Sequence, residues 1–170
     1  MLADRQGNAS IELASGLAEE IVRNFGELRL RVFGTSMVPS ILPGDLVYIH
    51  QAGLNEISPG EVVLFLQNGR LFVHRVTDRK LAAAAGGAEE MRLITRGDRQ
   101  RQNDPPVSSS ELLGRVDSIE RDGRRVEFRA NGSNGLIVQL LRTSDSLTSL
   151  YLRLAACGRS VFLRRDKCQG

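Results

Sequence analysis

A serine at position 36 lies in a short stretch that could hold its hydroxyl in one place. Residues 34–49 read GTSMVPSILPGDLVYI, between two runs with strand-like patterning. Gly34 permits backbone conformations that a side chain forbids, and Pro39 and Pro43 stiffen the chain after the serine. A serine fixed in this way can act as a nucleophile if a base reaches it. On this stretch alone, a Gly/Pro-rich loop whose serine only caps backbone groups stays open as the alternative.

The chain has two histidines, His50 and His74, as candidates for that base. His50 ends the apolar run after the serine stretch, where it could be a surface or edge residue. His74 lies in an alternating run between Val73 and Arg75, where an inward imidazole needs a hydrogen-bond partner. A buried histidine that bonds only a backbone carbonyl is the alternative interpretation. A Ser–His pair also requires a group, usually a carboxylate, that orients the imidazole.

Two aspartates, Asp98 and Asp104, flank a polar connection that follows the apolar run of residues 91–95. Both are suitably placed in sequence order to supply this carboxylate. Spacing alone does not decide between them, because aspartate in Gly-Asp and Asp-Pro turns is common for conformational reasons.

Strand patterns dominate the middle of the chain. Two turn pairs, Asn68-Gly69 and Asp122-Gly123, each separate two apolar runs and predict β-hairpins. Residues 81–90 are small and nearly featureless, and we expect a mobile loop there. About seven short strands predict a mainly β protein, with an antiparallel sheet or partly closed barrel. The predicted strands cover residues 27–32, 45–49, 60–66, 70–76, 91–95, 112–121 and 124–129.

Helical patterns lie at the two ends of the chain. Leu13, Leu17, Ile21 and Phe25 recur at every fourth position and predict an amphipathic helix that ends at Gly26. Residues 136–163 follow a helical period with a basic side. Such a tail can pack on its own domain or make peripheral contact with an anionic membrane, and both uses stay open. The expected units are an N-terminal helix (1–26), a β-domain (27–130) and a C-terminal basic amphipathic helical tail (131–170).

Composition narrows the class of protein. The chain has 170 residues, 41% hydrophobic and 25% charged, which is ordinary for a globular protein. Its +3 net charge comes from dispersed basic residues with few aromatics, which disfavours nucleic-acid binding. Cys157 and Cys168 suggest neither a zinc site nor a disulfide framework, and we expect no metal or cofactor. With no secretory signal and no apolar run long enough to span a bilayer, we expect a cytoplasmic chain, at most peripheral at the membrane.

Four segments resemble, in order, the motifs of type I signal peptidases. GTSMVPSILPGD resembles their serine box, PGEVVLFLQNGRLFVHRV their second box, LITRGDRQRQNDPP their third box, and LLGRV the strand that follows. The resemblance covers roughly residues 34–116. It implies the antiparallel signal-peptidase-like β-fold, which the self-cleaving SOS-repressor family shares.

The resemblance also implies roles for individual residues. In this superfamily the base is lysine in the common bacterial enzymes and the repressors, and histidine in the endoplasmic-reticulum, archaeal and sporulation-type enzymes. His74 stands at that place, which indicates the Ser–His branch. Ser36 would then be the nucleophile, His74 the general base and acid, and Asp104 the carboxylate that orients the imidazole, with Asp98 in support.

The oxyanion and substrate segment implied by the resemblance comprises Ser36, Thr35, Met37 and Pro39, with the backbone N–H of Ser36 as the first oxyanion donor. Typical family enzymes carry a hydroxyl two residues before the nucleophile. This chain has Gly34 there, and the nearest hydroxyl is that of Thr35.

Three functions follow from these observations. The first is a serine endopeptidase resembling signal peptidase I, without a transmembrane anchor, that cleaves protein or peptide substrates after small residues in an Ala-x-Ala context. The second is a catalytically weak or inactive peptide-binding module of the same fold, which Gly34 favours. The third is a self-cleaving regulator, with small-residue segments at residues 82–86 and 155–158, which would need a DNA-binding domain that residues 1–33 cannot supply.

Overall fold

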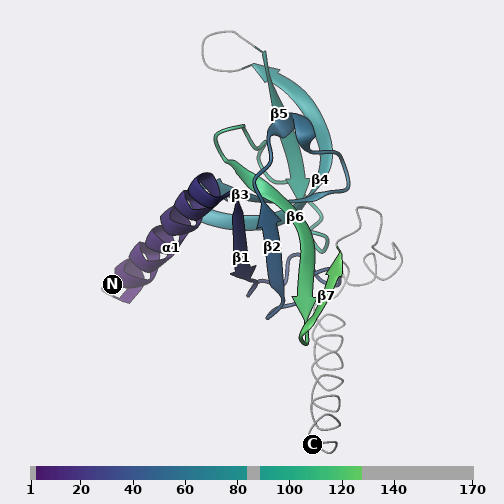
Figure 1. The fold of residues 1–170 in the computed structure, drawn as a ribbon. Helices are drawn as coiled ribbons and strands as arrows, with labels where there is room; N and C mark the ends of the chain where they lie inside the picture. The colour runs from purple at the N-terminus through teal and green to yellow at the C-terminus, as the bar shows by residue number, and fades with distance from the viewer. Residues whose placement is uncertain (1–2, 84–88, 128–170) are drawn as a thin grey trace, which may run out of the picture.

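The computed structural model describes residues 3–83 and 89–127, as one long helix followed by a β-sheet (Figure 1). The predicted C-terminal helical tail and both cysteines lie outside the described residues. The elements, in chain order, are α1 (Ala3–Phe25), β1 (Glu27–Arg31), β2 (Leu46–His50), the short 3₁₀ helix η1 (Leu54–Glu56), β3 (Val62–Gln67), β4 (Arg70–Ala83), β5 (Glu89–Arg96), β6 (Leu112–Arg121) and β7 (Arg124–Glu127).

The seven strands form a single antiparallel sheet in the order β1-β2-β6-β3-β4-β5, with β7 paired to β6. The mainly antiparallel β-fold and the N-terminal helix are therefore confirmed. Among the described strands this path ends at β1 and β5, so the sheet is not closed. Of the two predicted alternatives the structure shows the antiparallel sheet and not the partly closed barrel, because periodicity reports which side chains face a core and not whether the outer strands meet.

The two predicted hairpin turns are present. Asn68 and Gly69 have φ values of 52° and 72°, and Asp122 and Gly123 have values of 54° and 74°. Two successive residues with positive φ are the requirement of a type I′ hairpin, which Asn-Gly and Asp-Gly meet at low cost. These turns join β3 to β4 and β6 to β7.

Two apolar clusters divide the core. The first gathers side chains from α1, the serine turn and strands β2, β3 and β6, with Met37, Ile49, Leu64 and Val116 among its buried members. The second gathers side chains from β3, β4, β5 and the segments beside them, including Phe65, Val76 and Leu93. Successive strand residues point to opposite faces of a sheet, so one strand can serve both clusters. Leu64 and Phe65 of β3 do so.

The predicted loop at residues 81–90 is wrong at both of its ends. β4 continues to Ala83 and β5 begins at Glu89, and the two strands pair from Arg75 and Arg96 outward to Ala83 and Glu89. Small residues carry no alternation that would indicate a strand, but backbone pairing with the partner strand does not require it. α1 begins at Ala3, whereas the apolar periodicity starts only at Leu13.

No helix within the described ranges has both the length and the apolar character needed to cross a bilayer.

Close packing of β6 against β2 depends on Gly114. A Cβ atom at this position would lie 2.3 Å from the carbonyl oxygen of His50. We expect Gly114→Ala to lower the free energy of unfolding by about 1–3 kcal/mol or more, because backbone must move to admit the methyl group. Gly16→Ala is the control, since a Cβ there meets nothing within 4 Å. Urea unfolding of the two variants should separate them, and equal midpoints would contradict the close approach.

Candidate active site

Ser36 lies in the turn that connects β1 to β2. Backbone hydrogen bonds close the base of this connection, from Val32 N to Asp45 O at 2.9 Å and from Gly44 N to Val32 O at 2.6 Å. Four apolar side chains of the turn are buried: Met37, Val38, Ile41 and Leu42. Core packing therefore holds the turn, and Ser36 itself stays half-buried at the surface.

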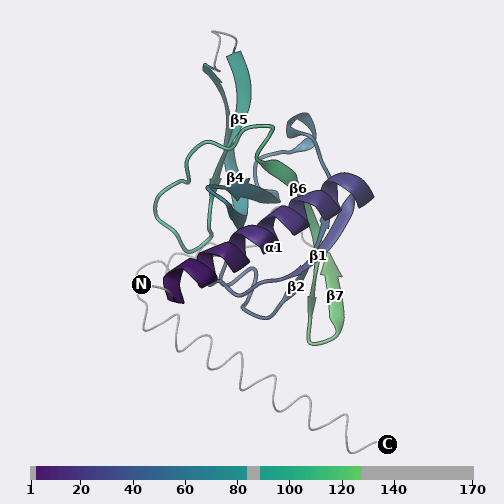
Figure 2. The same cartoon turned by 90° about the vertical axis from the view of Figure 1, so that its left-hand side faces the viewer.

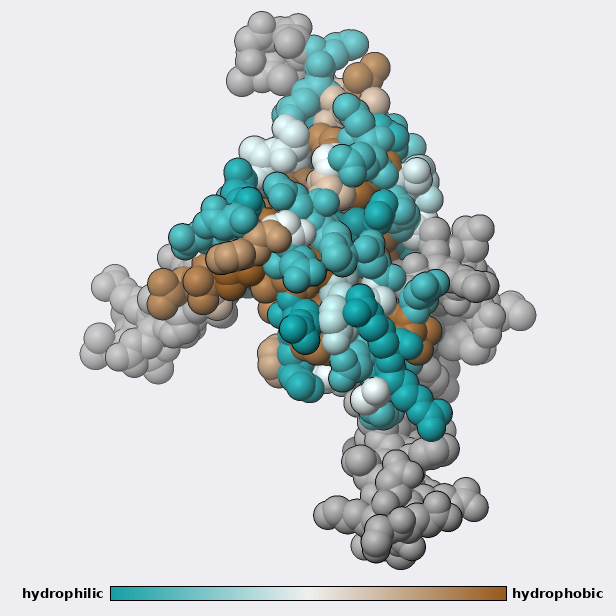
Figure 3. Space-filling model, viewed as in Figure 1, coloured by the Kyte–Doolittle hydropathy of each residue, from teal (hydrophilic) through white to brown (hydrophobic). Residues whose placement is uncertain are grey.

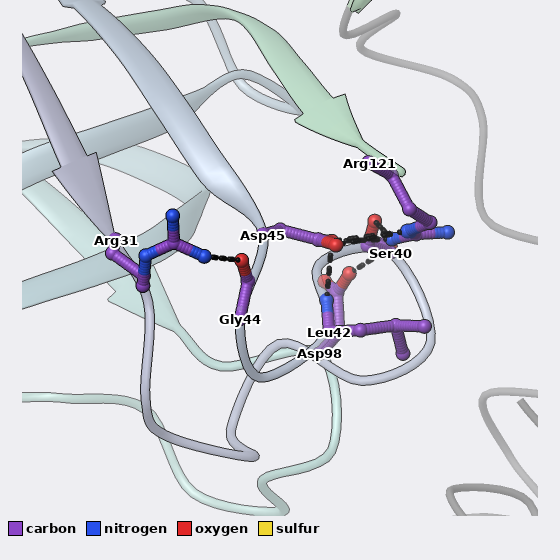
Figure 4. A network of polar contacts seen from close by, with 7 residues as sticks. All are labelled: Arg31, Ser40, Leu42, Gly44, Asp45, Asp98 and Arg121. Carbon is purple, nitrogen blue, oxygen red and sulfur yellow. Dashed lines mark hydrogen bonds and ion pairs between the residues drawn. The ribbon is translucent and has the colours of Figure 1, made fainter. Parts of the chain in front are cut away.

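A buried carboxylate fixes the far end of the same turn. Asp45 accepts hydrogen bonds from Leu42 N at 2.7 Å and from Arg121 Nη2 at 2.6 Å. Arg121 reaches across from the end of β6 and also donates to the carbonyl of Ser40 at 3.2 Å (Figure 4). The Gly-Asp part of the serine motif thus anchors the turn to the sheet.

His74 is the inward-facing histidine on β4. Its side chain is 3% exposed and contacts the rings of Phe65 and Phe72, with centroid distances of 6.0 and 5.7 Å. Its Nε2 atom lies 3.0 Å from Ser36 Oγ, and its Nδ1 atom lies 2.7 Å from Asp104 Oδ2. The buried imidazole therefore has a partner at each nitrogen.

Asp104 approaches His74 from the connection after β5. The Asp104 backbone N–H donates to Thr95 O, and the Thr95 hydroxyl donates to Asp104 Oδ2, both at 2.8 Å. Thr95 is fully buried on β5. Its backbone and side chain together hold the carboxylate toward the imidazole.

These contacts determine which ring nitrogen can accept a proton. An ionised carboxylate only accepts hydrogen bonds, so Asp104 favours a proton on His74 Nδ1. Nε2 then presents its lone pair to the Ser36 hydroxyl. Chemically, the arrangement can take a proton from Ser36 Oγ and hold the resulting imidazolium beside a carboxylate.

Asp98 pairs with Arg75, which donates from Nε to Oδ1 at 2.7 Å and from Nη2 to Oδ2 at 2.9 Å. Ser40 also donates its hydroxyl to Asp98 Oδ2, and Arg75 Nη1 donates to Gly60 O at 2.7 Å. Asp98 therefore links β4 to the serine turn.

The turn that carries Asp98 also lies directly against the serine. Arg99 N donates to Ser36 O at 2.8 Å. A Cβ atom on Gly97 would lie 2.9 Å from both Ser36 Cβ and Ser36 O. Only a glycine allows this approach, so the Arg-Gly-Asp segment supports the backbone at Ser36.

Other residues singled out in the sequence have different surroundings. Met37 is buried in the first core cluster, and Pro39 and Thr35 are half-buried in the serine turn. His50 is at the end of β2, where its Nε2 atom lies 3.6 Å from Asp117 Oδ2 near the surface. No signal in the sequence indicates a role for Thr95, Arg75 or Ser40, because a hydroxyl or guanidinium within a motif does not indicate its partner.

No group of histidine, cysteine, aspartate or glutamate side chains suited to a metal ion occurs within residues 3–83 and 89–127.

The buried ion pair predicts a stability difference between Asp98, in the turn after β5, and Asp78 on β4. The side chains of Arg75 and Asp98 are only 13% and 5% exposed. We expect Asp98→Asn to lower the free energy of unfolding by about 3 kcal/mol, because the guanidinium is left without its counter-charge. Asp78→Asn, in the exposed pair with Lys80, should change it by less than about 1 kcal/mol. Urea denaturation measures both, and a small effect at Asp98 would contradict the assigned pairing.

A protein-family model matches the part of the chain that carries Ser36 and His74. The Peptidase S24-like family model matches residues 2–83, a range that includes Ser36 and His74 and ends before Asp98 and Asp104. A search among curated proteins finds no match. This match over slightly less than half of the chain supports assigning the chain to the superfamily of S24-like and signal-peptidase-like serine peptidases.

Proposed function

We propose that the chain is a serine endopeptidase that resembles signal peptidase I and cleaves after small residues by a Ser–His–Asp mechanism. The observation that carries the proposal is the connected series Ser36 Oγ, His74 and Asp104, with distances of 3.0 and 2.7 Å. Three side chains from three separate segments meet in the order that nucleophilic catalysis requires: a hydroxyl, a base and a carboxylate that orients the base.

In the proposed reaction His74 Nε2 takes the proton of Ser36 as Oγ attacks the carbonyl carbon of a peptide bond. The imidazolium then donates this proton to the leaving amine, and the acyl group remains on Oγ. Water, deprotonated by His74, attacks the ester and releases the acid. Asp104 stabilises the imidazolium in each half of the reaction, and Thr95 keeps the carboxylate in place.

The negative charge that forms on the carbonyl oxygen needs hydrogen-bond donors to stabilise it. Within the described residues, no acceptor bonds the Ser36 N–H, which leaves this group open to the oxyanion. We assign it as the first donor. The Thr35 hydroxyl is the candidate for the second donor, since Gly34 has no side chain to offer.

An extended substrate fits the free edge of β4. β3 pairs with β4 over residues 70–75, whereas β5 pairs only from Arg75 onward. In an antiparallel ladder, alternate residues direct their backbone groups to opposite edges, so Leu71 and Val73 direct theirs away from β3. A peptide that adds to this edge would pass beside His74. Preference for small residues before the cleaved bond rests on the resemblance to signal peptidases.

A peptide-binding module without efficient catalysis is the second candidate. The observation that favours it is Gly34, which is exposed and lies where related enzymes carry a hydroxyl. Such a module would still bind a peptide along the β4 edge but would not cleave it efficiently.

Cleavage of a fluorogenic Ala-x-Ala peptide separates the two functions. We expect the chain to cleave the peptide, and Ser36→Ala and His74→Ala each to lower kcat/KM by on the order of 10⁴-fold or more. The other histidine provides the matched control: His50→Ala should retain activity. Peptide binding without cleavage by the unmutated chain would favour the module, and equal loss in His50→Ala and His74→Ala would contradict the assigned base.

The support behind Ser36 gives a second prediction. Gly97→Ala introduces a methyl group 2.9 Å from Ser36 Cβ, so the hydroxyl must shift relative to His74. We expect kcat to fall on the order of 10²-fold, since displacement of about 1 Å has that effect on aligned reacting groups. Gly53→Ala is the control, because its nearest contact is the flexible carboxylate of Glu56 at 3.4 Å. Unchanged kcat in Gly97→Ala would show that the turn does not position the serine.

A further inference from the structure

The helix α1 packs on the sheet through its small residues. Ser15, Ala18 and Val22 are buried, whereas Leu13, Leu17 and Phe25 are 76%, 56% and 75% exposed. Figure 3 shows hydrophobic residues gathered along the visible side of the helix. The large apolar stripe that the sequence indicates therefore faces away from the core, and α1 is attached by a narrow face.

This narrow face lies beside the proposed peptide-binding edge. α1 contacts β1, β4 and β6, and Figure 2 shows the helix crossing in front of the sheet with β4 on one side and β1 on the other. Val22 belongs to the first core cluster, against which Leu71 and Val73 of β4 also pack. These are the two residues whose backbone groups the substrate would need.

Two polar contacts join the C-terminal end of α1 to the rest of the domain. Gln51 N donates to Gly26 O at 2.8 Å, and Arg23 Nη2 donates to Ser110 O at 3.2 Å. Gly26, with φ of 74°, connects the helix directly to β1. The ion pair of Glu19 with Arg23, at 2.8 Å, stays within the helix. The described polar contacts of α1 with the domain therefore lie next to Gly26, which is the point about which a displaced helix would turn.

We propose that α1 is a displaceable cover of the peptide-binding edge, which competes with substrate for the space beside Leu71 and Val73. The inference rests on the proposed function, since a cover has meaning only if a peptide uses that edge. Closed, the helix shields the half-buried apolar side chains between β1 and β4. Open, it admits an extended peptide to β4 and to Ser36.

Hydrogen exchange on the full-length Ser36→Ala protein tests the cover directly. This variant should bind an Ala-x-Ala peptide without cleaving it. We expect the bound peptide to speed amide exchange in residues 13–22 of α1, because the helix loses its packing, and to slow exchange at Leu71 and Val73. Unchanged or slower exchange in α1 while the peptide is bound would overturn the cover and leave the proposed function standing.

A pair of matched variants tests the competition by affinity. Ala18→Arg places a charged side chain in the buried contact, whereas Ala14→Arg makes the same change on the exposed side of the helix. If the covered state holds about nine-tenths of the molecules, release should tighten peptide binding by up to about tenfold in Ala18→Arg alone. In the active protein KM should fall with kcat unchanged.

The remaining outcomes also decide between the cover and its alternatives. Equal affinity in Ala18→Arg and Ala14→Arg, with both folded by circular dichroism, would overturn the cover. Absence of peptide binding in every variant, the released one included, would instead refute the proposed function, and with it the need for a cover. If Ala18→Arg fails to fold, the exchange measurement on Ser36→Ala decides alone.

Discussion

The ion pair between Arg75 and Asp98 connects the three chain segments that carry the candidate active site. Arg75 is the neighbour of His74 on β4, and Asp98 lies on the connection that leads to Asp104. The hydroxyl of Ser40 joins the same carboxylate from the serine turn. Two buried charges are costly to remove from water unless hydrogen bonds satisfy them, and here the bidentate contact, Ser40 and Gly60 O do so. One satisfied pair thus joins the segments that carry Ser36, His74 and Asp104.

In the proposed function, the alternation of side chains along β4 separates catalysis from substrate binding. His74 shares a strand face with Phe72 and Val76, against the second core cluster, where its ring is shielded from water. Leu71 and Val73 point to the first cluster on the opposite face. Between the two faces runs the backbone edge of β4 that, among the described strands, β5 leaves unpaired before Arg75. A peptide bound along this edge would reach the proposed nucleophile while the proposed base stays buried, so a single strand would supply both the imidazole and the binding edge.

Local signals in the sequence predicted the parts of the fold that local physics determines. Asn68-Gly69 and Asp122-Gly123 indicate their hairpins because few other residue pairs accept two positive φ values. The choice between Asp98 and Asp104 was not local: both lie in turns, and only the folded connection brings Asp104 to His74 and Asp98 to Arg75. Thr95 and Ser40 carried no signal of their own, because a hydroxyl suits almost any environment. The open sheet and the long β4–β5 arm depend on pairing between distant strands, which periodicity does not report.

The orientation of α1 shows where an amphipathic pattern ceases to predict packing. Leu13, Leu17 and Phe25 form the stripe that would ordinarily face a core. The first core cluster is already filled by side chains of the sheet and the serine turn, and Val22 is the one residue of the described helix surface buried within it. A helix that approaches a filled core closely must do so with small residues, here Ser15 and Ala18. Little apolar area is then buried in the contact, and segments with few buried apolar contacts open at low free energy. A helix attached by this narrow contact therefore lies against β4 as well as against β1 and β6.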